Sequence, residues 1–248
     1  MDHPLGIDFG GTGIKGAPVD LAAGDFAQKK VKIDTPRPAT PTAVAGVFRE
    51  LVADFPRSAA AVGITVPGVM KRGVVHSAPN IDPAWIGTDA DALFTEALGR
   101  EVHLINDADA AGLAEVEYGA ARGRRGLVIV TTLGTGIGSA LVHDGVLVPN
   151  SELGHVQIDG RVAEQHAANS IRERDDLSWP EWAERLTVYY RTLERLFTPE
   201  LFVVGGGVSQ QSEEFLPLIE IETEIVPATL RNRAGIIGAA LAASRAAS

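Results

Sequence analysis

Short apolar runs alternate along the chain with longer segments in which apolar residues recur at helical spacing. The spacing predicts helices over Pro41–Phe55, with Thr40 as N-cap, over Trp179–Phe197, and from about Ala234. It also predicts helices in "DALFTEALG", from Asp107 in "DADAAGLAEVEYGAAR" and near "SEEFLPLI", and strands in "AAAVGITVPG", "EVHLIN", "LFVVGGG" and "TEIVPA". Strands that alternate with helices predict an α/β protein with largely parallel sheets.

An internal repeat divides the chain into two halves. The string "GTGI" occurs at residues 11–14 and again at 134–137, an offset of 123 residues. At this offset the apolar arms also match, because Ile7 falls on Val130 and Ala17 falls on Ala140. Each half is therefore predicted to contain a strand, a glycine turn and a second strand.

The composition narrows the function classes. The formal net charge of -10 over 248 residues disfavours a nucleic-acid surface, which needs clustered Lys and Arg. The absence of cysteine excludes disulfides, thiolate zinc sites and cysteine catalysis. The start "MDHPLGID" lacks signal-peptide features, and no stretch reaches the roughly 18 apolar residues of a membrane span. We expect a cytoplasmic protein with no membrane or nucleic-acid partner.

The segment "GIDFGGTGIKG", residues 6–16, matches two phosphate-binding motifs by spelling alone. Gly11, Gly13 and Gly16 have the spacing of the dinucleotide fingerprint, but a strand follows them where that motif requires a helix. The P-loop motif requires Ser or Thr after its Lys, and Lys15 is followed by Gly16. Neither of the two motifs therefore applies.

Two interpretations of residues 6–16 remain. The segment is either a hairpin that binds phosphate through its backbone or a tight turn that only reverses the chain. Its glycines let N–H groups approach phosphate oxygens closely, while Thr12 adds a hydroxyl donor and Lys15 a cation. Asp8 is expected to hold Mg²⁺ through water, because magnesium keeps several of its waters. The predicted phosphate-binding residues here are Asp8, Gly10, Gly11, Thr12, Gly13 and Lys15.

Three segments resemble the ROK family of sugar kinases and sugar-responsive repressors: "DFGGTGIKG", "LINDADAAGLAE" and "TTLGTGIGSALVHDGVLVPNSELGH". Within this family the chain is most similar to the actinobacterial polyphosphate glucokinases, through "SELGHVQIDG", "RERDDLSWPEWA" and "TPELFVVGGGVS". The resemblance implies the actin-like ATPase fold, a duplicated ribonuclease H-like α/β fold with two lobes around a cleft. We expect a small domain of residues 1–106 with 232–248, and a large domain of residues 107–231.

The resemblance also assigns a catalytic base. Spacing alone leaves Asp107 equally open as a helix N-cap or as the base that accepts a hydroxyl proton. The family places its catalytic Asp directly after Asn, as in Asn106-Asp107, which favours the base.

The sugar ligands implied by the resemblance are Asn106, Asp107, Glu152, His155 and Glu164. In most of the family the matching His joins a cysteine cluster on structural zinc, and with no cysteine no such site is expected here. Gly68 and Asn80 are candidates to close the sugar pocket, with a simple turn as the alternative reading.

The second hairpin is expected to supply further donor contacts. Gly134, Thr135 and Gly136 would form a second phosphate-binding turn, and Gly205, Gly206 and Gly207 resemble the adenosine loop of the family. Polyphosphate would need cations along its path, and the possible ones are Lys15, Arg122, Arg124, Arg125, Arg231 and Arg233. We hypothesise that the Arg122–Arg125 turn feeds the donor cleft, with a solvated turn as the alternative.

The expected function is a glucokinase that transfers a phosphoryl group from polyphosphate, ATP or both to the 6-hydroxyl of glucose, with mannose as a possible second substrate. The alternatives are an ATP-only ROK kinase for fructose, mannose or N-acetylmannosamine, and a sugar-sensing regulator. A regulator is expected to carry a DNA-binding segment ahead of the first hairpin, which begins at residue 6. The helix Trp179–Phe197 is expected to pack in the core, while Trp179 and Tyr190 leave room for a homodimer contact.

Overall fold

The computed structural model describes residues 3–56, 61–78 and 81–247. The chain forms two compact units: unit 1 is Met1–Ala110 with Arg233–Ser248, and unit 2 is Ala111–Asn232. The first boundary, after Ala110, lies four residues beyond the expected one after residue 106. The second boundary, before Arg233, lies one residue beyond the expected one before residue 232. The units have similar lengths, so neither is the small domain.

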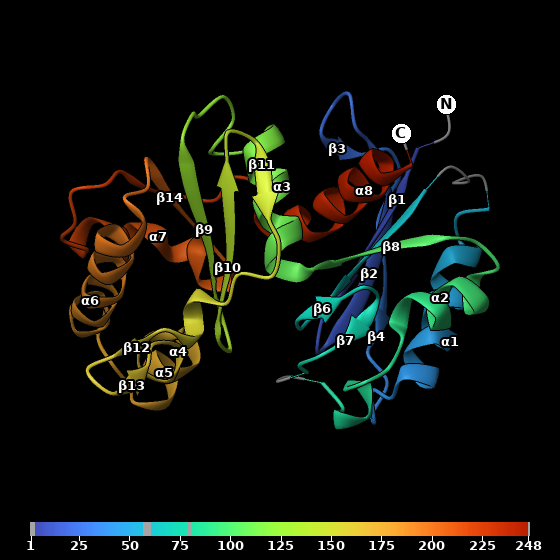
Figure 1. Ribbon diagram of the computed structural model, residues 1–248, viewed down its shortest axis with the longest axis horizontal. Helices are drawn as coiled ribbons and strands as arrows, with labels where there is room; N and C mark the ends of the chain where they lie inside the picture. The colour runs from blue at the N-terminus through green and yellow to red at the C-terminus, as the bar shows by residue number, and fades with distance from the viewer. Residues whose placement is uncertain (1–2, 57–60, 79–80, 248) are drawn as a thin grey trace. The chain divides into compact units, whose positions relative to one another are not determined.

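A mixed sheet forms the centre of unit 1 (Figure 1). Its strands lie in the order β3 (Asp25–Phe26), β2 (Gly13–Asp20), β1 (Leu5–Phe9), β5 (Val62–Val66) and β8 (Val102–Asn106), and β4 (Val31–Asp34) also pairs with β2. Strands β1, β5 and β8 are parallel, whereas β2 runs antiparallel to β1. The other elements are α1 (Pro41–Ala53), β6 (Met70–Lys71), β7 (Val74–Val75), a 3-10 turn (Pro83–Trp85), α2 (Ala90–Leu98), the start of α3 (Asp107–Tyr118) and α8 (Ala234–Ala246).

The two faces of this sheet differ in side-chain size because successive residues of a strand point to opposite faces. Leu5, Ile7 and Phe9 of β1 are buried in a core that includes Phe48 of α1 and Phe94 of α2. The intervening positions of β1 are Gly6 and Asp8, so the opposite face carries little bulk. One face is therefore packed with apolar side chains, and the other is left for close backbone approach.

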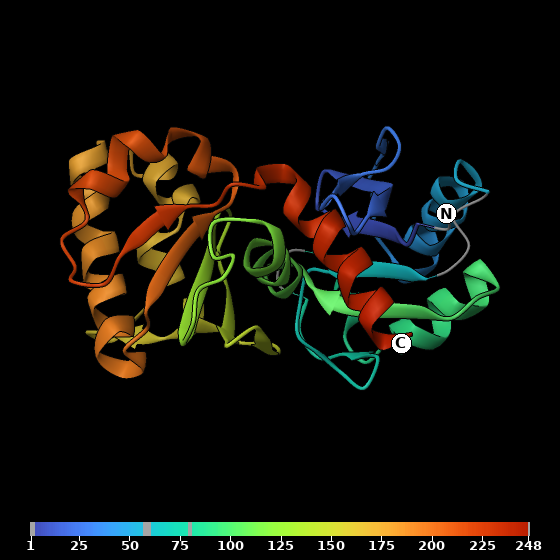
Figure 2. The same cartoon turned by 90° about the horizontal axis from the view of Figure 1, so that it is seen from above.

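Helix α8 occupies the glycine face of the sheet (Figure 2). Gly6 and Gly63 are direct partners on the neighbouring strands β1 and β5. A Cβ at Gly6 would overlap the carbonyl oxygen of Ile236, and a Cβ at Gly63 would overlap that of Ala239. The α8 backbone therefore rests directly on the sheet backbone, which only glycine permits.

Unit 2 repeats the same strand order. Its sheet runs β11 (Val146–Val148), β10 (Ile137–His143), β9 (Leu127–Leu133), β14 (Leu201–Gly205) and β15 (Ile225–Pro227), with the central hairpin β9–β10 antiparallel and β14 parallel to β9. The remaining elements are a 3-10 turn (Leu153–His155), β12 (Gln157–Ile158), β13 (Arg161–Val162), α4 (Glu164–Ala167), α5 (Asn169–Arg174), α6 (Trp179–Phe197), α7 (Ser212–Phe215) and 3-10 turns at Gly207–Gln211, Leu216–Leu218 and Arg231–Arg233.

The register of the repeat differs from the prediction by one residue in the first arm. Phe9 pairs with Ile14, whereas Leu133 pairs with Ile137, so the second turn is one residue shorter. The second arms correspond at the predicted offset of 123, but Ile7 corresponds to Thr131 rather than Val130. The burial pattern of β1 recurs unchanged over residues 129–133, which supports the corrected register.

The predicted helices and strands are present with small changes at their ends. Helix α1 ends at Ala53 rather than Phe55, and the segment "SEEFLPLI" forms only a short helix followed by a 3-10 turn. Helix α6 has the predicted bounds, and Glu181 accepts a hydrogen bond from the Ser178 N–H at 2.9 Å. None of the helices in the described ranges combines the length and apolar character needed to cross a bilayer.

The interpretation of Tyr190 as a partner-facing residue is wrong. Its side chain is fully buried, and its hydroxyl forms a 2.7 Å hydrogen bond with the Thr131 hydroxyl of β9. Trp179 is half-buried and stacks on Phe215, with the Arg172 guanidinium 4.2 Å from its ring centre. The aromatic side chains of α6 therefore serve the core of unit 2.

We predict that Gly63→Ala destabilises the protein by about 2–3 kcal/mol, because the new methyl group overlaps the α8 backbone and forces the helix outward. The matched control is Gly46→Ala in α1, where no atom lies within 4 Å of the added Cβ. Alanine has the higher helix propensity, so the control should keep or raise stability by up to about 1 kcal/mol. The free energy of unfolding of each variant is measured by urea denaturation, with circular dichroism as the signal. An unchanged midpoint for Gly63→Ala would contradict the close packing.

Candidate functional site

The turn of the first hairpin is closed by backbone bonds and held from outside by a threonine. The Gly10 N–H donates to the Gly13 carbonyl at 3.2 Å, and the Thr35 hydroxyl donates to the Gly10 carbonyl at 2.5 Å. Gly11 and Thr12 at the tip are exposed, and no atom lies within 4 Å of a Cβ built at Gly11. The tip therefore presents open backbone in a fixed conformation, as a phosphate-binding turn requires.

Asp8 lies at the end of β1 among three oriented neighbours. Its Oδ1 accepts a hydrogen bond from the Thr65 hydroxyl at 3.2 Å, and its Oδ2 is 3.5 Å from the Lys15 ammonium. The Thr65 hydroxyl also accepts the Phe9 N–H at 3.0 Å. A Cβ at Gly235 would lie 3.0 Å from Oδ1, so the carboxylate is beside the first turn of α8, where the helix dipole favours negative charge.

Lys32 is a cation at this turn that the sequence reasoning missed. It is the cross-strand partner of Lys15, and its side chain lies over Gly13, where a Cβ would overlap its Cε. Its ammonium is 3.5 Å from Asp34, and its side chain is 53% exposed. The alternation of apolar and polar residues in "VKID" indicates a strand, but it does not indicate that this strand pairs with β2 and brings Lys32 to the turn.

The turn of the second hairpin is held in a similar way. The Gly134 N–H donates to the Gly136 carbonyl at 3.0 Å. Ser170 of α5 braces the turn twice, since its N–H donates to the Gly134 carbonyl at 3.0 Å and its hydroxyl to the Thr135 carbonyl at 2.6 Å. Both predicted phosphate turns therefore use a hydroxyl from a distant segment to fix a turn carbonyl.

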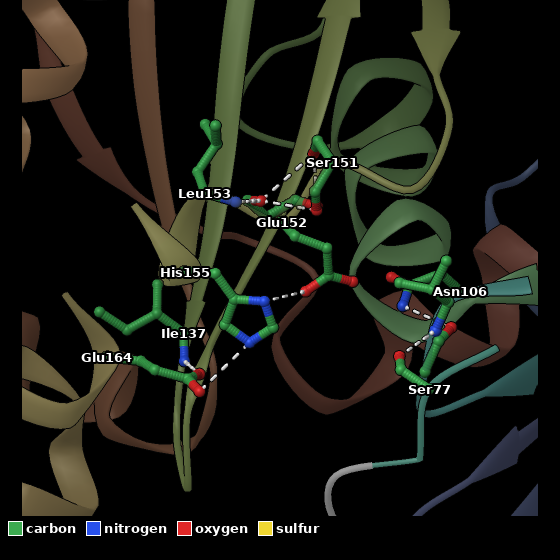
Figure 3. A network of polar contacts seen from close by, with 11 residues as sticks. Ser77, Asn106, Ile137, Ser151, Glu152, Leu153, His155 and Glu164 are labelled. Carbon is green, nitrogen blue, oxygen red and sulfur yellow. Dashed lines mark hydrogen bonds and ion pairs between the residues drawn. The ribbon is translucent and has the colours of Figure 1, made fainter. Parts of the chain in front are cut away.

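A serine pair anchors the loop that follows the second hairpin (Figure 3). The buried Ser139 of β10 donates to the Ser151 carbonyl at 2.9 Å and accepts the Leu153 N–H at 2.9 Å. The Ser151 hydroxyl donates back to the Ser139 carbonyl at 2.9 Å. Gly154 completes the contact, because a Cβ there would overlap the Ile137 carbonyl oxygen.

The three predicted sugar ligands of unit 2 lie together, with Glu152 and His155 on this anchored loop and Glu164 at the start of α4 (Figure 3). His155 bridges two carboxylates, with Nδ1 3.7 Å from Glu152 and Nε2 3.4 Å from Glu164. Glu164 also accepts the Ile137 N–H at 3.1 Å and covers Gly136, where a Cβ would overlap its Oε2. The Glu-His-Glu group is therefore bonded directly to the second glycine turn.

Asn106, and not Asp107, caps helix α3. The Asn106 Oδ1 accepts the N–H groups of Ala108 at 2.8 Å and Asp109 at 3.1 Å, which is the bonding of an N-cap. Its Nδ2 donates to the Gly68 carbonyl at 3.2 Å. The N-cap interpretation of Asp107 is therefore wrong, and its exposed carboxyl group occupies the first turn.

Gly68 has a packing role that accounts for its lack of a side chain. A Cβ at Gly68 would overlap the Ser77 carbonyl oxygen, and Ser77 in turn accepts the Val69 N–H at 3.0 Å. The Gly68 carbonyl accepts the hydrogen bond from the Asn106 side-chain amide, so Gly68 helps to position the start of α3 through Asn106. The other candidate for closing the sugar pocket, Asn80, lies outside the described residues.

The three glycines at the end of β14 have different surroundings. Gly205 is the buried last residue of the strand, where a Cβ would make only ordinary contacts. Gly206 has a φ of 87°, and a Cβ there would overlap the Leu133 backbone, so this position needs glycine for conformation and packing. Gly207 is exposed, with no atom within 4 Å of a built Cβ. Open backbone for a flat base is therefore available at Gly207.

The sequence profile of the ROK family matches residues 4–171. The chain belongs to the ROK family. It is 48% identical to a polyphosphate glucokinase of Mycobacterium tuberculosis over 97% of this chain and 91% of that protein. It is 47% identical to the polyphosphate glucokinase of Mycobacterium leprae over 97% of this chain and 74% of that protein.

Two solved structures are also similar to this ROK chain. The inorganic polyphosphate/ATP-glucomannokinase of Arthrobacter sp. strain KM matches with a TM-score of 0.94 and 52% identity, over 99% of this chain and 100% of that one. A ROK glucokinase of Streptomyces griseus, in complex with glucose and AMPPNP, matches with a TM-score of 0.85 and 26% identity, over 98% and 99%. The predicted actin-like ATPase fold is confirmed.

The Arg122–Arg125 turn lies away from the second glycine turn of this ROK chain. It precedes β9, whereas Gly134 follows the end of β9, and a strand of seven residues is roughly 20 Å long. Arg124 is also paired with Glu224 at 2.7 Å. Arg233 is paired with Asp25 at 2.7 Å, and Arg231 precedes it in a 3-10 turn. This placement favours the solvated-turn interpretation of the Arg122–Arg125 cluster.

We predict that Glu152→Gln raises the melting temperature at pH 7 more than at pH 4. Burial, with a further contribution from the Glu164 charge, raises the pKa of Glu152 above its ordinary value, against the opposing effect of His155. The folded state therefore binds the Glu152 proton more tightly than the unfolded state does. The free energy of unfolding falls as the pH rises from the unfolded-state pKa of Glu152 through its higher folded-state pKa. The substitution removes this dependence.

Thermal unfolding of both proteins at the two pH values measures the effect. The exposed Glu213→Gln in α7 is the matched control and should leave the pH dependence as in the wild type. A melting-temperature gain for Glu152→Gln that is equal at pH 4 and pH 7 would contradict the assignment.

Proposed function

We propose that this ROK chain is a glucokinase that transfers a terminal phosphoryl group from polyphosphate, ATP or both to the 6-hydroxyl of glucose. The observation that carries the proposal is the 48–52% identity, over nearly the whole chain, to a polyphosphate glucokinase and a polyphosphate/ATP-glucomannokinase. Mannose is a second proposed substrate. The arrangement of the two units as lobes around a cleft stays a prediction.

Asp107 is the proposed base. Its carboxylate would accept the proton of the sugar 6-hydroxyl as the oxygen forms its bond to the terminal phosphorus and the bond to the rest of the donor breaks. Exposure at the first turn of α3 suits this role, and the helix dipole favours the ionised form. Asn106 is a positioning residue, because its side chain is committed to the α3 cap and to Gly68. A direct sugar contact from Asn106 stays a prediction.

Glu152, His155 and Glu164 are the proposed sugar ligands of unit 2. Carboxylates accept hydrogen bonds from sugar hydroxyls, and an imidazole offers a donor or an acceptor. The bond from the Ile137 N–H to Glu164 ties this group to the glycine turn. A sugar held by Glu164 would therefore lie close to the segment proposed to hold the donor.

The donor phosphates are proposed to bind at the two braced glycine turns, with Lys15 and Lys32 as cations of the first. The donor set at Asp8 also fits Mg²⁺, which takes one or two carboxylates and completes its shell with water and substrate phosphates. One oxygen of Asp8 is oriented by Thr65, and the other is 3.5 Å from Lys15. When bound, magnesium would neutralise charge on the transferred phosphate.

An ATP-only kinase is the second candidate, because the similar Streptomyces griseus glucokinase binds glucose with AMPPNP and Gly207 offers open backbone here. A sugar-responsive regulator is not proposed, since the chain is only 19% identical to the solved structure of a ROK family transcriptional regulator, and this likeness shows the fold alone. A homodimer and a cytoplasmic location stay predictions from the sequence.

A coupled assay with glucose, mannose, fructose and N-acetylmannosamine, each with ATP and with polyphosphate, tests the function. We expect 6-phosphate product from glucose with polyphosphate. Product with ATP alone would favour the second candidate, and no product in any pairing from folded protein would reject both.

We predict that Asp107→Asn lowers kcat by about 10²- to 10⁴-fold, because the amide cannot accept the hydroxyl proton. Glucose binding, measured by calorimetry, should change little, because the neutral amide keeps the size of the side chain. Asp91→Asn is the matched control, since Asp91 is an exposed acidic residue in the first turn of α2. Turnover above a tenth of the wild-type rate would reassign the base.

We predict that Lys32→Gln raises KM for polyphosphate by about two- to fivefold and leaves KM for glucose unchanged, because an exposed cation contributes modestly. The control is the triple replacement of Arg122, Arg124 and Arg125 by Gln, whose turn lies at the other end of β9 from Gly134. Steady-state kinetics should show no change in this control. A larger effect in the control than in Lys32→Gln would restore the arginine hypothesis.

A further inference from the structure

The lysines of this chain are concentrated in one part of unit 1. The sequence contains five lysines, and four of them are Lys15 in β2, Lys32 in β4, and Lys29 and Lys30 just before β4. Residues 29–37 carry four basic side chains and one acidic side chain, whereas the whole chain has a formal net charge of -10. These four lysines, called here the lysine cluster, therefore form a local excess of positive charge on an acidic protein.

The pairing of β4 with β2 brings the lysine cluster to the first glycine turn (Figure 1). Lys15 and Lys32 are direct cross-strand partners, so their side chains lie on the same face of the sheet. On this face the Lys32 side chain covers Gly13, which follows the exposed tip of the turn. Val31 and Ile33 alternate with Lys32 and pack against the apolar core of unit 1. Their burial therefore fixes the face that carries Lys32.

The acidic neighbours of this lysine pair compensate its charge only in part. Two like charges at directly opposed strand positions repel each other and disfavour folding. The Lys15 ammonium is 3.5 Å from Asp8, and the Lys32 ammonium is 3.5 Å from Asp34, whose side chain is 90% exposed. An ion pair so open to water contributes little. A bound anion would relieve the repulsion between the two ammonium groups.

Lys29 and Lys30 extend the positive charge away from the turn. Strand β4 ends at Asp34, the partner of Gly13, so its beginning is further from the glycine turn. An extended chain advances about 3.3 Å per residue, which places Lys30 and Lys29 up to about 7 and 10 Å beyond Lys32. Neither has an ion-pair partner within the described ranges of the chain. The cluster is therefore a row of ammonium groups that begins at the turn.

We propose that the lysine cluster binds the part of a polyphosphate chain that extends beyond the phosphoryl groups held at the first glycine turn. This inference rests on the proposed function, which supplies the donor and its reacting end. Polyphosphate is a flexible linear polyanion, and ammonium groups neutralise it as point charges without a fixed binding geometry. ATP carries a nucleoside after its phosphate groups, so it offers no charge to the far lysines. Lys29 and Lys30 therefore favour polyphosphate over ATP.

The test is direct binding without glucose, measured by calorimetry with long-chain polyphosphate and with tripolyphosphate as probes. The wild type should bind the long chain more tightly. The double variant Lys29→Gln/Lys30→Gln should raise the Kd of the long chain by about three- to tenfold, because each exposed charge contributes modestly. The Kd of tripolyphosphate should change by less than about twofold, because this probe is too short to reach from the turn to both lysines.

Lys71→Gln is the matched control, because Lys71 is the fifth lysine and is exposed in β6. It should bind both probes as the wild type does. Lys29→Arg/Lys30→Arg keeps the charge and should also bind the long chain as the wild type does. Equal affinity of the wild type for both probes, an unchanged Kd in the glutamine variant, or an equal loss for both probes would overturn the proposal.

Turnover of glucose with ATP separates this proposal from the proposed function. The glutamine double variant should keep the wild-type rate with ATP, because neither lysine is among the residues proposed to hold the sugar or the reacting phosphate. A fall in the ATP rate as large as the loss of polyphosphate binding would overturn the proposal. Absence of turnover with every donor in the wild type would instead reject the proposed function.

Discussion

The surroundings of Asp8 depend on the direct contact between the α8 backbone and the sheet of unit 1. Gly6 and Gly63 are paired on β1 and β5, and α8 rests on both. Two residues further along the same strands, on the same face, are Asp8 and Thr65. The close packing therefore brings the first turn of α8 beside Asp8, while Thr65 holds the carboxylate from the neighbouring strand.

Much of the fold could be predicted from the sequence, because its helices and its repeated hairpin depend on periodicity and on glycine. The helices α1 and α6 and the duplication of the hairpin were visible as patterns. The register of the duplication was not, since aligning the two "GTGI" strings fixes only the second arms, and the turns differ by one residue. The cap of α3 was also ambiguous, because Asn106 and Asp107 are equally good N-cap residues by type.

The contacts that hold the candidate site rigid were beyond sequence reasoning. Thr35, Thr65, Ser139 and Ser170 bond to groups 12 to 57 positions away along the chain, and a single hydroxyl residue carries no pattern that announces such a partner. Each satisfies a turn carbonyl, a loop carbonyl or a carboxylate. A site so braced is ordered before its ligands arrive, which lowers the entropy lost on binding.

The discontinuous composition of unit 1 has a consequence for synthesis on the ribosome. Unit 2 is inserted between Ala110 and Arg233, and α8 belongs to unit 1. The sheet of unit 1 thus emerges early but keeps its glycine face uncovered until the residues beyond Arg233 have been translated. Unit 2 is contiguous and has its own core, so the order of translation lets it fold first, although it begins second.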